Sequence, residues 1–387
     1  MGECPRLAQM TCPRSAASRV LGHQFVSEFS GVELQKSSML GGQSETVKYR
    51  VFAGTWNVGG VAPPDDLDLE DWLDTKTDSY DIYVLGFQEV VPLNARTVLG
   101  PKQRRAAMKW NLLIGDALNN RRHGDGVAAM HDQGQGGVFR CLVSKQMVGI
   151  FVSVWTRSSL RRHVRHPAVS SVGTGVLGRL GNKGAVSVRF LLHGTSFCFV
   201  CCHLASGGKD GDALRRNADA VDILSRTSFL SYGGAPAAPD ELPKKILGHD
   251  RVVLFGDLNY RIAMDDDDEA RQLVGARKWS MLLENDELLL ELCSGRQFDR
   301  WHEGYVAFAP TYKYRRNSDQ FYWCPDGVAT GRDKQHRVPA WCDRILWRGK
   351  GMKQVRYERC GGYRLSDHRP VRAVFHAVCE LVEGVDA

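Results

Sequence analysis

Polar residues that could bind a metal ion or move a proton stand at the ends of several short apolar runs of the chain. They are Asn57, Glu89, His203, Asp257, Asn259, Asp367 and His368. Open α/β sheets hold their sites at strand ends, where the backbone is fixed and side chains face a cleft, so we expect these residues to meet. Carboxylate and amide oxygens without a thiolate cluster suit a hard cation, and this set predicts Mg²⁺.

Each of these features alone also has an ordinary structural interpretation. A lone Glu89 after a strand is typical of a solvated turn, a lone His203 of a hydrogen-bonded edge histidine, and GDLN (256–259) of an Asx turn. The chain lacks GxxxxGK[ST], GxSxG and HExxH motifs, which argues against a P-loop enzyme, a nucleophile elbow and a zinc protease. Cys342 is expected to be a buried packing cysteine rather than a nucleophile.

The elements that must position these residues are short runs rich in Val, Ile and Phe, bounded by Gly, Pro and Asn. Such runs are typical of strands. The predicted strands are 49–54, 80–87, 148–155, 184–192, 196–202, 251–256, 343–347 and 371–378. With helical segments between them, they predict an α/β fold.

Two segments have helical periodicity, 209–229 and 278–293. The residues that form the apolar face of the first are Leu214, Ala218, Val221 and Leu224. The acidic run 265–269 is expected to open a further helix, because acidic side chains are stabilised near the positive end of the helix dipole. Gly-rich stretches at 119–137 and 231–239 predict surface loops.

Composition limits the class of protein. The chain has 387 residues, of which 43% are apolar and 25% charged, and it contains no run of 18 apolar residues. This predicts a globular chain without a membrane-spanning helix. We expect residues 1–46 to form an N-terminal tail and 47–380 a single domain. The 11 scattered cysteines favour a reduced, intracellular, cytoplasmic protein, and the net charge of +7 favours an anionic partner.

A series of motifs carries a family resemblance. They are TWNVGG (55–60), FQEVV (87–91), GNKGAVSVRF (181–190), HLASG (203–207), FGDLNYRI (255–262), PTYKY (310–314), PAWCDRIL (339–346) and SDHRPV (366–371). The chain resembles the inositol polyphosphate 5-phosphatases, within the DNase I-like Mg²⁺ phosphoesterases, and 92–100 and 144–155 are most similar to plant members. The resemblance implies a four-layer α/β/β/α sandwich of two packed, mixed β-sheets flanked by helices.

The resemblance also implies roles for the polar residues at the ends of the strands. Glu89 is expected to be the main Mg²⁺ ligand, with Asn57 beside the metal or the scissile phosphate. Asp367 completes the acidic metal site. Asp257 is expected to orient and deprotonate the attacking water.

The remaining catalytic roles concern the transferred phosphoryl group. Asn259 is expected to donate a hydrogen bond to it from an extended segment, pointing the same way as the residue two positions earlier. His203 binds the phosphate or assists the leaving oxygen. His368 contacts the same oxygens and is kept cationic by Asp343.

By the same resemblance, substrate is expected to be bound by polar and cationic side chains outside the catalytic group. They are Asn182, Lys183, Arg261, Tyr312, Lys313, Lys334 and Arg337. Tyr312, Lys313 and Arg337 match family positions that bind the 4-phosphate. Gln335 departs from the family pattern, which usually has Lys there. Either Lys334 substitutes for it, or the 4-phosphate is held less tightly.

The predicted function is Mg²⁺-dependent hydrolysis of a 5-phosphate by in-line attack of water. The expected substrates are phosphatidylinositol 4,5-bisphosphate and 3,4,5-trisphosphate, soluble inositol 1,4,5-trisphosphate, or both kinds. A nuclease of the same fold and a non-catalytic phosphoinositide-binding module remain alternatives. We expect a monomer that does not bind nucleic acid. The basic run 157–166 is expected to be a solvated face or a peripheral contact with an anionic membrane surface.

Overall fold

The structure is a computed structural model that describes residues 45–78, 80–92, 102–119, 139–175, 181–229, 242–264, 266–322 and 338–381. The sequence features that lie outside this part of the chain are residues 1–44, 120–137 and 231–239 and the side chains of Lys334, Gln335 and Arg337. The boundary between tail and domain therefore stays a prediction. In the described part of the chain, the helices are too short or too polar to cross a bilayer.

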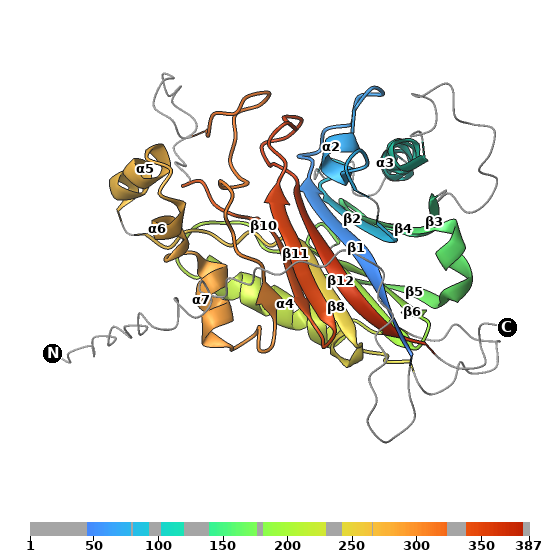
Figure 1. Ribbon diagram of the computed structural model, residues 1–387. Coiled ribbons are helices and arrows are strands. Elements are labelled where there is room, and N and C mark those ends of the chain that lie inside the picture. Colours follow the sequence, from blue (N-terminus) through green and yellow to red (C-terminus); the bar gives the residue numbers. More distant parts are fainter. Residues whose placement is uncertain are drawn as a thin grey trace.

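Two six-stranded sheets form the centre of the molecule (Figure 1). The first contains, in spatial order, β11 (Met352–Arg359), β12 (Val371–Glu380), β1 (Thr46–Asn57), β2 (Ile82–Gln88), β4 (Ile150–Arg157) and β3 (Phe139–Met147). The second contains β5 (Val164–Gly173), β6 (Gly184–Leu192), β7 (Thr195–His203), β8 (Arg251–Asp257), β10 (Asp343–Arg348) and β9 (His302–Glu303). β1–β2 and β7–β8 are parallel pairs and their neighbours are antiparallel, so both sheets are mixed.

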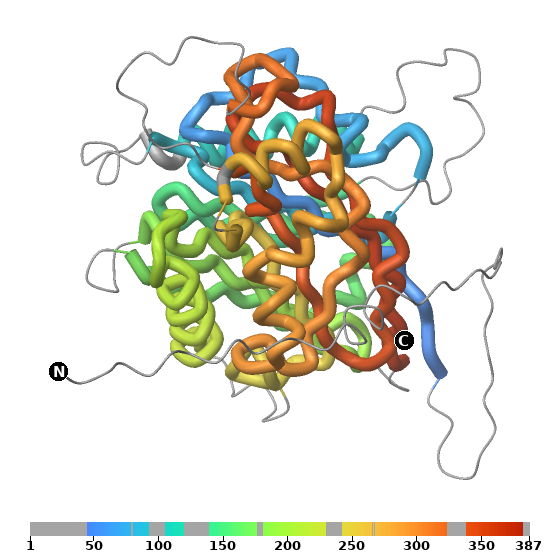
Figure 2. The backbone as a smooth tube through the Cα atoms, turned by 90° about the vertical axis from the view of Figure 1, so that its left-hand side faces the viewer, coloured from blue at the N-terminus to red at the C-terminus, as the bar shows by residue number. Residues whose placement is uncertain are grey.

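Helices cover both outer faces of the sheet pair, which confirms the four-layer architecture. On the first sheet lie α2 (Glu70–Leu73) and α3 (Lys102–Asn119), and on the second lie α4 (Asp212–Arg226) and α7 (Glu287–Ser294). The remaining helical elements are α5 (Asp267–Gly275), α6 (Trp279–Leu283) and the short 3₁₀ turns η2 (Ser158–His163) and η4 (Ile246–Gly248). The first and last strands, β1 and β12, run side by side (Figures 1 and 2).

The central strands are buried on both faces. In β1, Val51 belongs to the core between the two sheets, whereas Phe52 packs into the core under α2 and α3. Strands buried in this way have continuous rather than alternating apolar sequences, which is why the sequence patterns identified them. All eight predicted strands form, as β1, β2, β4, β6, β7, β8, β10 and β12.

The strands that the sequence did not predict are β3, β5, β9 and β11. Each is an edge strand of one of the two sheets. Edge strands carry polar and charged residues on their exposed sides, as in β3, where Arg140, Cys141, Ser144 and Lys145 are exposed. Their sequences therefore lack the apolar runs on which the prediction depended.

The prediction for the apolar face of α4 was largely wrong. Leu214 is 71% exposed and Val221 is 48% exposed, whereas Arg216 and Asn217 are buried together with Ile223. Periodicity assigns the apolar face to the core by default. Here the polar face is buried instead, because its side chains find hydrogen-bond partners in the loops beneath the helix.

The second predicted helix, 278–293, is two helices, α6 and α7. Asp286 separates them, because its side chain accepts the Leu289 N–H at 2.9 Å and so caps the start of α7. The prediction for the acidic run was correct. Asp266 caps α5 by accepting N–H groups from Asp268 and Glu269.

Candidate active site

The parallel pairs β1–β2 and β7–β8 bring the predicted catalytic residues to one end of the two sheets. His203 and Asp257 are paired residues at the ends of β7 and β8, and Asp343 at the start of β10 pairs with Asp257 from the other side. Asn57 ends β1, and Glu89 directly follows β2. The motifs that contain Asn57 and Asp343, 286 residues apart in the chain, therefore lie in a single site.

The glycine before Asp257 is required by close backbone contact. Gly256 has φ of 141°, and a Cβ atom there would lie 2.0 Å from the carbonyl oxygen of Cys202 on β7. Any other residue would push the two strands apart. This explains why a glycine directly precedes Asp257 at the end of β8.

Asp257 is the buried centre of the site. Its Oδ2 accepts the Asn57 amide N–H at 2.8 Å and lies 3.4 Å from His203 Nε2 and 3.9 Å from His368 Nε2. Burial by itself raises the pKa of this carboxyl, but His368 and then His203 outweigh that effect and hold the pKa well below its usual range. Asp257 is therefore an ionised hydrogen-bond acceptor.

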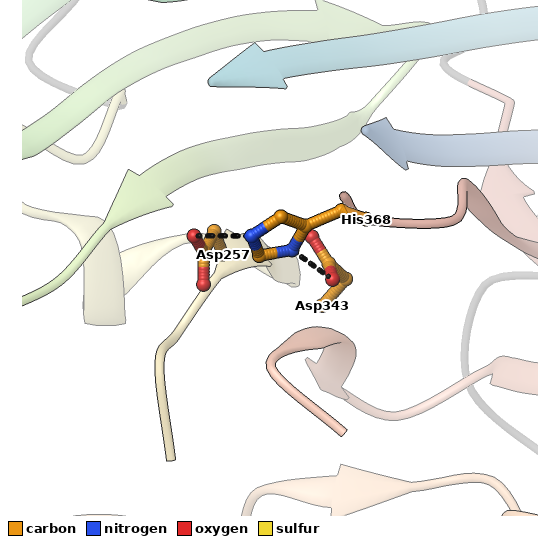
Figure 3. A group of neighbouring side chains, drawn as sticks. All are labelled: Asp257, Asp343 and His368. Atoms are coloured by element: carbon orange, nitrogen blue, oxygen red, sulfur yellow. Dashed lines mark hydrogen bonds and ion pairs between the residues drawn. The ribbon is translucent and has the colours of Figure 1, made fainter. Parts of the chain in front are cut away.

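His368 lies between two buried carboxylates (Figure 3). Its Nδ1 lies 2.8 Å from Asp343 Oδ2, and its Nε2 faces Asp257. Burial lowers the pKa of His368, but Asp343 and Asp257 outweigh this and raise it to about 9. The predicted pairing with Asp343 is therefore present, and the imidazole is a cation at neutral pH.

His203, in contrast, is neutral. Burial lowers its pKa, and Lys183, whose Nζ lies 2.5 Å from His203 Nε2, lowers it further. Burial lowers the pKa of Lys183 as well. The site thus contains a neutral histidine beside a lysine on one side of Asp257 and a cationic histidine on the other.

Glu89 and Asn57 form the part of the site that fits a divalent cation. The Glu89 side chain is 30% exposed, and its Oε1 lies 3.3 Å from Asn57 Nδ2 and 3.7 Å from His203 Nε2. Asn57 Oδ1 accepts the Gly59 N–H at 3.0 Å and retains a second lone pair. The Asp367 carboxylate lies against the same turn, 3.5 Å from where a Gly59 Cβ would be. These hard oxygen donors suit Mg²⁺ or Ca²⁺.

Asp257, Asp343 and His368 also lie close enough together to suggest a metal site. Their chemistry argues against it. A protonated imidazole donates from both nitrogens and has no lone pair for a metal. In this trio His368 itself supplies the positive charge that compensates the two carboxylates.

Asn259 lies in the site but not in the conformation expected. β8 ends at Asp257, and Asn259 has φ of 58°, so the segment is a left-handed turn rather than extended. Its backbone N–H donates to Asp257 Oδ1 at 3.1 Å, an Asx turn of the kind that GDLN alone indicates. Its side chain donates to the Leu204 carbonyl and accepts from Arg261.

The substrate-binding candidates have different surroundings. Arg261 is buried, its guanidinium lies 4.6 Å from the Tyr312 ring, and its Nε and Nη1 have no hydrogen-bond partner among the described residues. Tyr312 in turn packs on His368 at 4.5 Å between ring centroids. Lys313 instead points its ammonium over the Tyr322 ring. The buried Oδ1 of Asn182 lacks a hydrogen-bond partner within the described chain.

Two hydroxyl residues that the sequence analysis missed hold the site together. Thr311 Oγ1 accepts the backbone N–H groups of Cys342 and Asp343. Ser366 Oγ donates to the Asn57 carbonyl at 2.6 Å and accepts the His368 N–H. Both residues stand inside motifs, next to residues that were chosen, and no periodic signal distinguishes them.

Cys342 is buried, as expected, and burial raises the pKa of its thiol. Cys342 and Arg348 have the C-x5-R spacing of cysteine phosphatases. The residues between them form strand β10 rather than a phosphate-binding loop. The thiol is a packing group.

Comparison with known proteins identifies the family. The family described as "Endonuclease/Exonuclease/phosphatase family 2" matches residues 54–374. The chain is 49% identical to type IV inositol polyphosphate 5-phosphatase 9 of Arabidopsis thaliana, over 94% of this chain and 90% of that protein. It is 45% identical to type I inositol polyphosphate 5-phosphatase 8 of the same plant, over 86% and 71%. The chain belongs to the inositol polyphosphate 5-phosphatases of this family.

Solved structures agree with the fold. The inositol polyphosphate 5-phosphatase domain of SPsynaptojanin, in complex with inositol (1,4)-bisphosphate and a calcium ion, superposes with a TM-score of 0.71 at 31% identity and covers 88% of this chain and 87% of that one. A Cimex nitrophorin superposes with a TM-score of 0.57 at 18% identity over 87% and 99%, which shows a shared fold alone.

Proposed function

We propose that this 5-phosphatase removes the 5-phosphate from substrates that also carry a 4-phosphate, with Mg²⁺ as its metal. The observation that carries the proposal is the placing of Asp257, a buried, ionised acceptor, between the Asn57 amide and the cationic His368. A phosphoryl transfer to water needs an acceptor for the water and positive charge for the phosphoryl oxygens. Asp257 Oδ2 is such an acceptor, and the cationic His368 Nε2 lies within 4 Å of it.

In this proposal, Asp257 accepts a hydrogen bond from the attacking water and aligns it with the scissile bond. Its low pKa keeps it ionised, so positioning rather than strong basicity is its main contribution. His368 donates a hydrogen bond from its Nε2 to a phosphoryl oxygen. Lys183 and His203 donate to the opposite side of the same group, where charge develops on the leaving oxygen.

Glu89, with Asn57 and Asp367, would hold the divalent cation. When bound, Mg²⁺ neutralises charge on the phosphoryl oxygens and polarises the phosphorus–oxygen bond. The fit of the donor set supports this choice, and the solved relative in complex with a calcium ion supports a hard divalent cation in such sites.

The identity of the substrate is inferred from the ligand of that relative and from Arg261. Removal of the 5-phosphate from inositol 1,4,5-trisphosphate leaves inositol 1,4-bisphosphate, the ligand in that complex. The buried guanidinium of Arg261, with unused donors beside Tyr312, is placed to bind a second phosphate. The same headgroup occurs in phosphatidylinositol 4,5-bisphosphate, so both the lipid and the soluble molecule are proposed substrates.

Phosphate release with Mg²⁺ tests the proposal. Inositol 1,4,5-trisphosphate and micellar phosphatidylinositol 4,5-bisphosphate are compared for the wild type, Asp257→Ala and the exposed control Asp299→Asn. We expect release that Asp257→Ala lowers by about 10³-fold or more and Asp299→Asn leaves unchanged. Silence of the folded wild type on both substrates would contradict the proposal. Cleavage of plasmid DNA in a parallel assay would favour the nuclease alternative.

A further inference from the structure

The buried polar face of α4 holds two segments of the active site. One is 203–207, which begins with His203, and the other is 257–262, which contains Asp257 and Arg261. Arg216 on α4 is fully buried, and its Nη1 donates to the carbonyl of Gly207 at 3.0 Å and that of Ala205 at 3.5 Å. These contacts fix the first segment directly after His203.

The same guanidinium reaches the second segment through Glu287. Arg216 Nη2 donates to Glu287 Oε2 at 2.6 Å, and that oxygen also accepts the backbone N–H of Arg261 at 2.8 Å. The backbone N–H of Glu287 donates back to the Arg261 carbonyl at 2.9 Å. The position of Arg261 is therefore tied to α4 through one carboxylate.

Neighbouring residues of α4 make parallel contacts to the same two segments. Asp219 Oδ2 accepts the Ala205 N–H at 2.8 Å, and Asn217 Oδ1 accepts the Tyr260 hydroxyl at 2.6 Å. The Arg216 guanidinium also lies 5.5 Å from the Tyr260 ring. The helix thus bonds to each segment at more than one point, which explains why its polar side is buried.

We propose that Arg216 is a positioning residue that sets the spacing between His203 and the substrate-binding Arg261. It touches neither substrate nor reacting atoms. The planar guanidinium suits this role, because it donates in two directions at once, to carbonyls on one side and to a carboxylate on the other. The lysine ammonium has no such fork, so Arg216→Lys keeps the charge and loses the geometry.

The inference rests on the proposed roles of His203 and Arg261, and steady-state kinetics with inositol 1,4,5-trisphosphate test it. We expect Arg216→Lys to raise KM and lower kcat, together about 10-fold or more in kcat/KM, since displacements near 1 Å are costly in such sites. The control is Arg215→Lys, one residue away, with a side chain that is 76% exposed and, among the described residues, bonded only to Asp212. We expect the control to change neither constant.

A double-mutant cycle with Arg261→Met separates positioning from a general loss of stability. In the Arg261→Met background, Arg216→Lys should change KM by less than twofold, because the side chain it positions is absent. A lower melting temperature with KM unchanged in Arg216→Lys would overturn the proposal. So would equal effects of Arg216→Lys in both backgrounds.

Hydrogen exchange provides a test that needs no substrate and so stays informative if the proposed function fails. We expect Arg216→Lys to speed exchange about 10-fold in peptides covering 203–208 and 258–263, but not in a peptide covering the last two turns of α7, 288–294. Unchanged protection would overturn the proposal. If Arg216→Lys does not fold, the double variant Arg216→Met with Glu287→Gln avoids an unpaired carboxylate and is measured in the same way.

Discussion

The two histidines beside Asp257 differ in charge, although both are buried: His203 is neutral and His368 is a cation. His203 faces Lys183, and this neighbour adds to the effect of burial in lowering its pKa. His368 faces Asp343 and Asp257, whose charges overcome burial and raise its pKa. The sequence shows where these two histidines stand in the chain, but not which groups surround them. Their charge states depend on partners that come from other strands.

The raised pKa of His368 makes part of the stability depend on pH. A group whose pKa rises on folding from 6.5 to about 9 stabilises the fold fully below pH 6.5, and that contribution is lost as pH rises through about 9. We expect wild type to lose about 3 kcal/mol of unfolding free energy between pH 6 and 10 that His368→Gln does not lose.

Urea unfolding at several pH values measures this difference. His203→Gln is the matched control, because the pKa of His203 is lowered on folding rather than raised, so His203 loses no stabilising contribution as pH rises. Identical slopes for wild type and His368→Gln above pH 6.5 would show that His368 is not held as a cation.

Glu89 is the residue on which metal binding is expected to depend most. Replacement by Gln removes the charge and keeps the shape, so we expect Glu89→Gln to raise the Mg²⁺ concentration for half-maximal activity by about 10-fold or more. The measurement is a Mg²⁺ titration of phosphate release, with the exposed Glu284→Gln as control. Equal Mg²⁺ dependence in wild type and Glu89→Gln would remove Glu89 from the metal site.

At the scale of elements, α4 shows how hydrophobic periodicity can point to the wrong face. Its exposed face carries Leu214 and Val221, and its buried face carries Arg216 and Asn217 beside Ile223. Burial of polar groups is tolerated only where hydrogen bonds replace those to water. The partners of Arg216 and Asn217 lie in loops before and after the helix and at the start of α7, too far along the chain for a local pattern to show them.

The orientation of α4 predicts an unusual set of stabilities. Leu214→Gln and Val221→Gln should change the unfolding free energy by less than about 0.5 kcal/mol, because both side chains already face water. Ile223→Ala, a smaller change in chemistry, should cost about 2 to 4 kcal/mol because it leaves a cavity in the core. Chemical denaturation of the three variants tests this. A larger loss in Leu214→Gln than in Ile223→Ala would contradict the orientation.

At the scale of the whole molecule, the basic run 157–166 lies far from the active site. It includes η2 and the start of β5, and the other end of β5 is Gly173, which pairs with Gly184, which in turn pairs with His203. A strand of this length spans about 30 Å. A membrane bound to the run would therefore meet the end of the sheets opposite the site.

Removal of charge from the run should accordingly leave lipid hydrolysis unchanged. We expect the double variant Arg161→Gln with Arg162→Gln, two exposed positions, to hydrolyse phosphatidylinositol 4,5-bisphosphate in anionic vesicles within twofold of wild type. Soluble inositol 1,4,5-trisphosphate is the parallel substrate. A loss of activity on vesicles alone would show that this end of the molecule contacts the membrane after all.

The sequence by itself determined the central strands and the polar residues at their ends. Strands buried on both faces need continuous apolar runs, and the end of such a strand holds a polar residue such as Asp257 in a fixed position. Each apolar run and the polar residue at its end lie within a few residues of one another, so a pattern in one short segment of the sequence reveals them.

Only the tertiary structure decided the edge strands, the buried side of α4 and the network around Arg216. In each case the free energy comes from contacts between residues far apart in the chain, such as Arg216 with Glu287 and His368 with Asp343. A buried charge is stable only if its partner arrives with the correct geometry. No pattern within a single segment contains that information, because the partner belongs to another part of the chain.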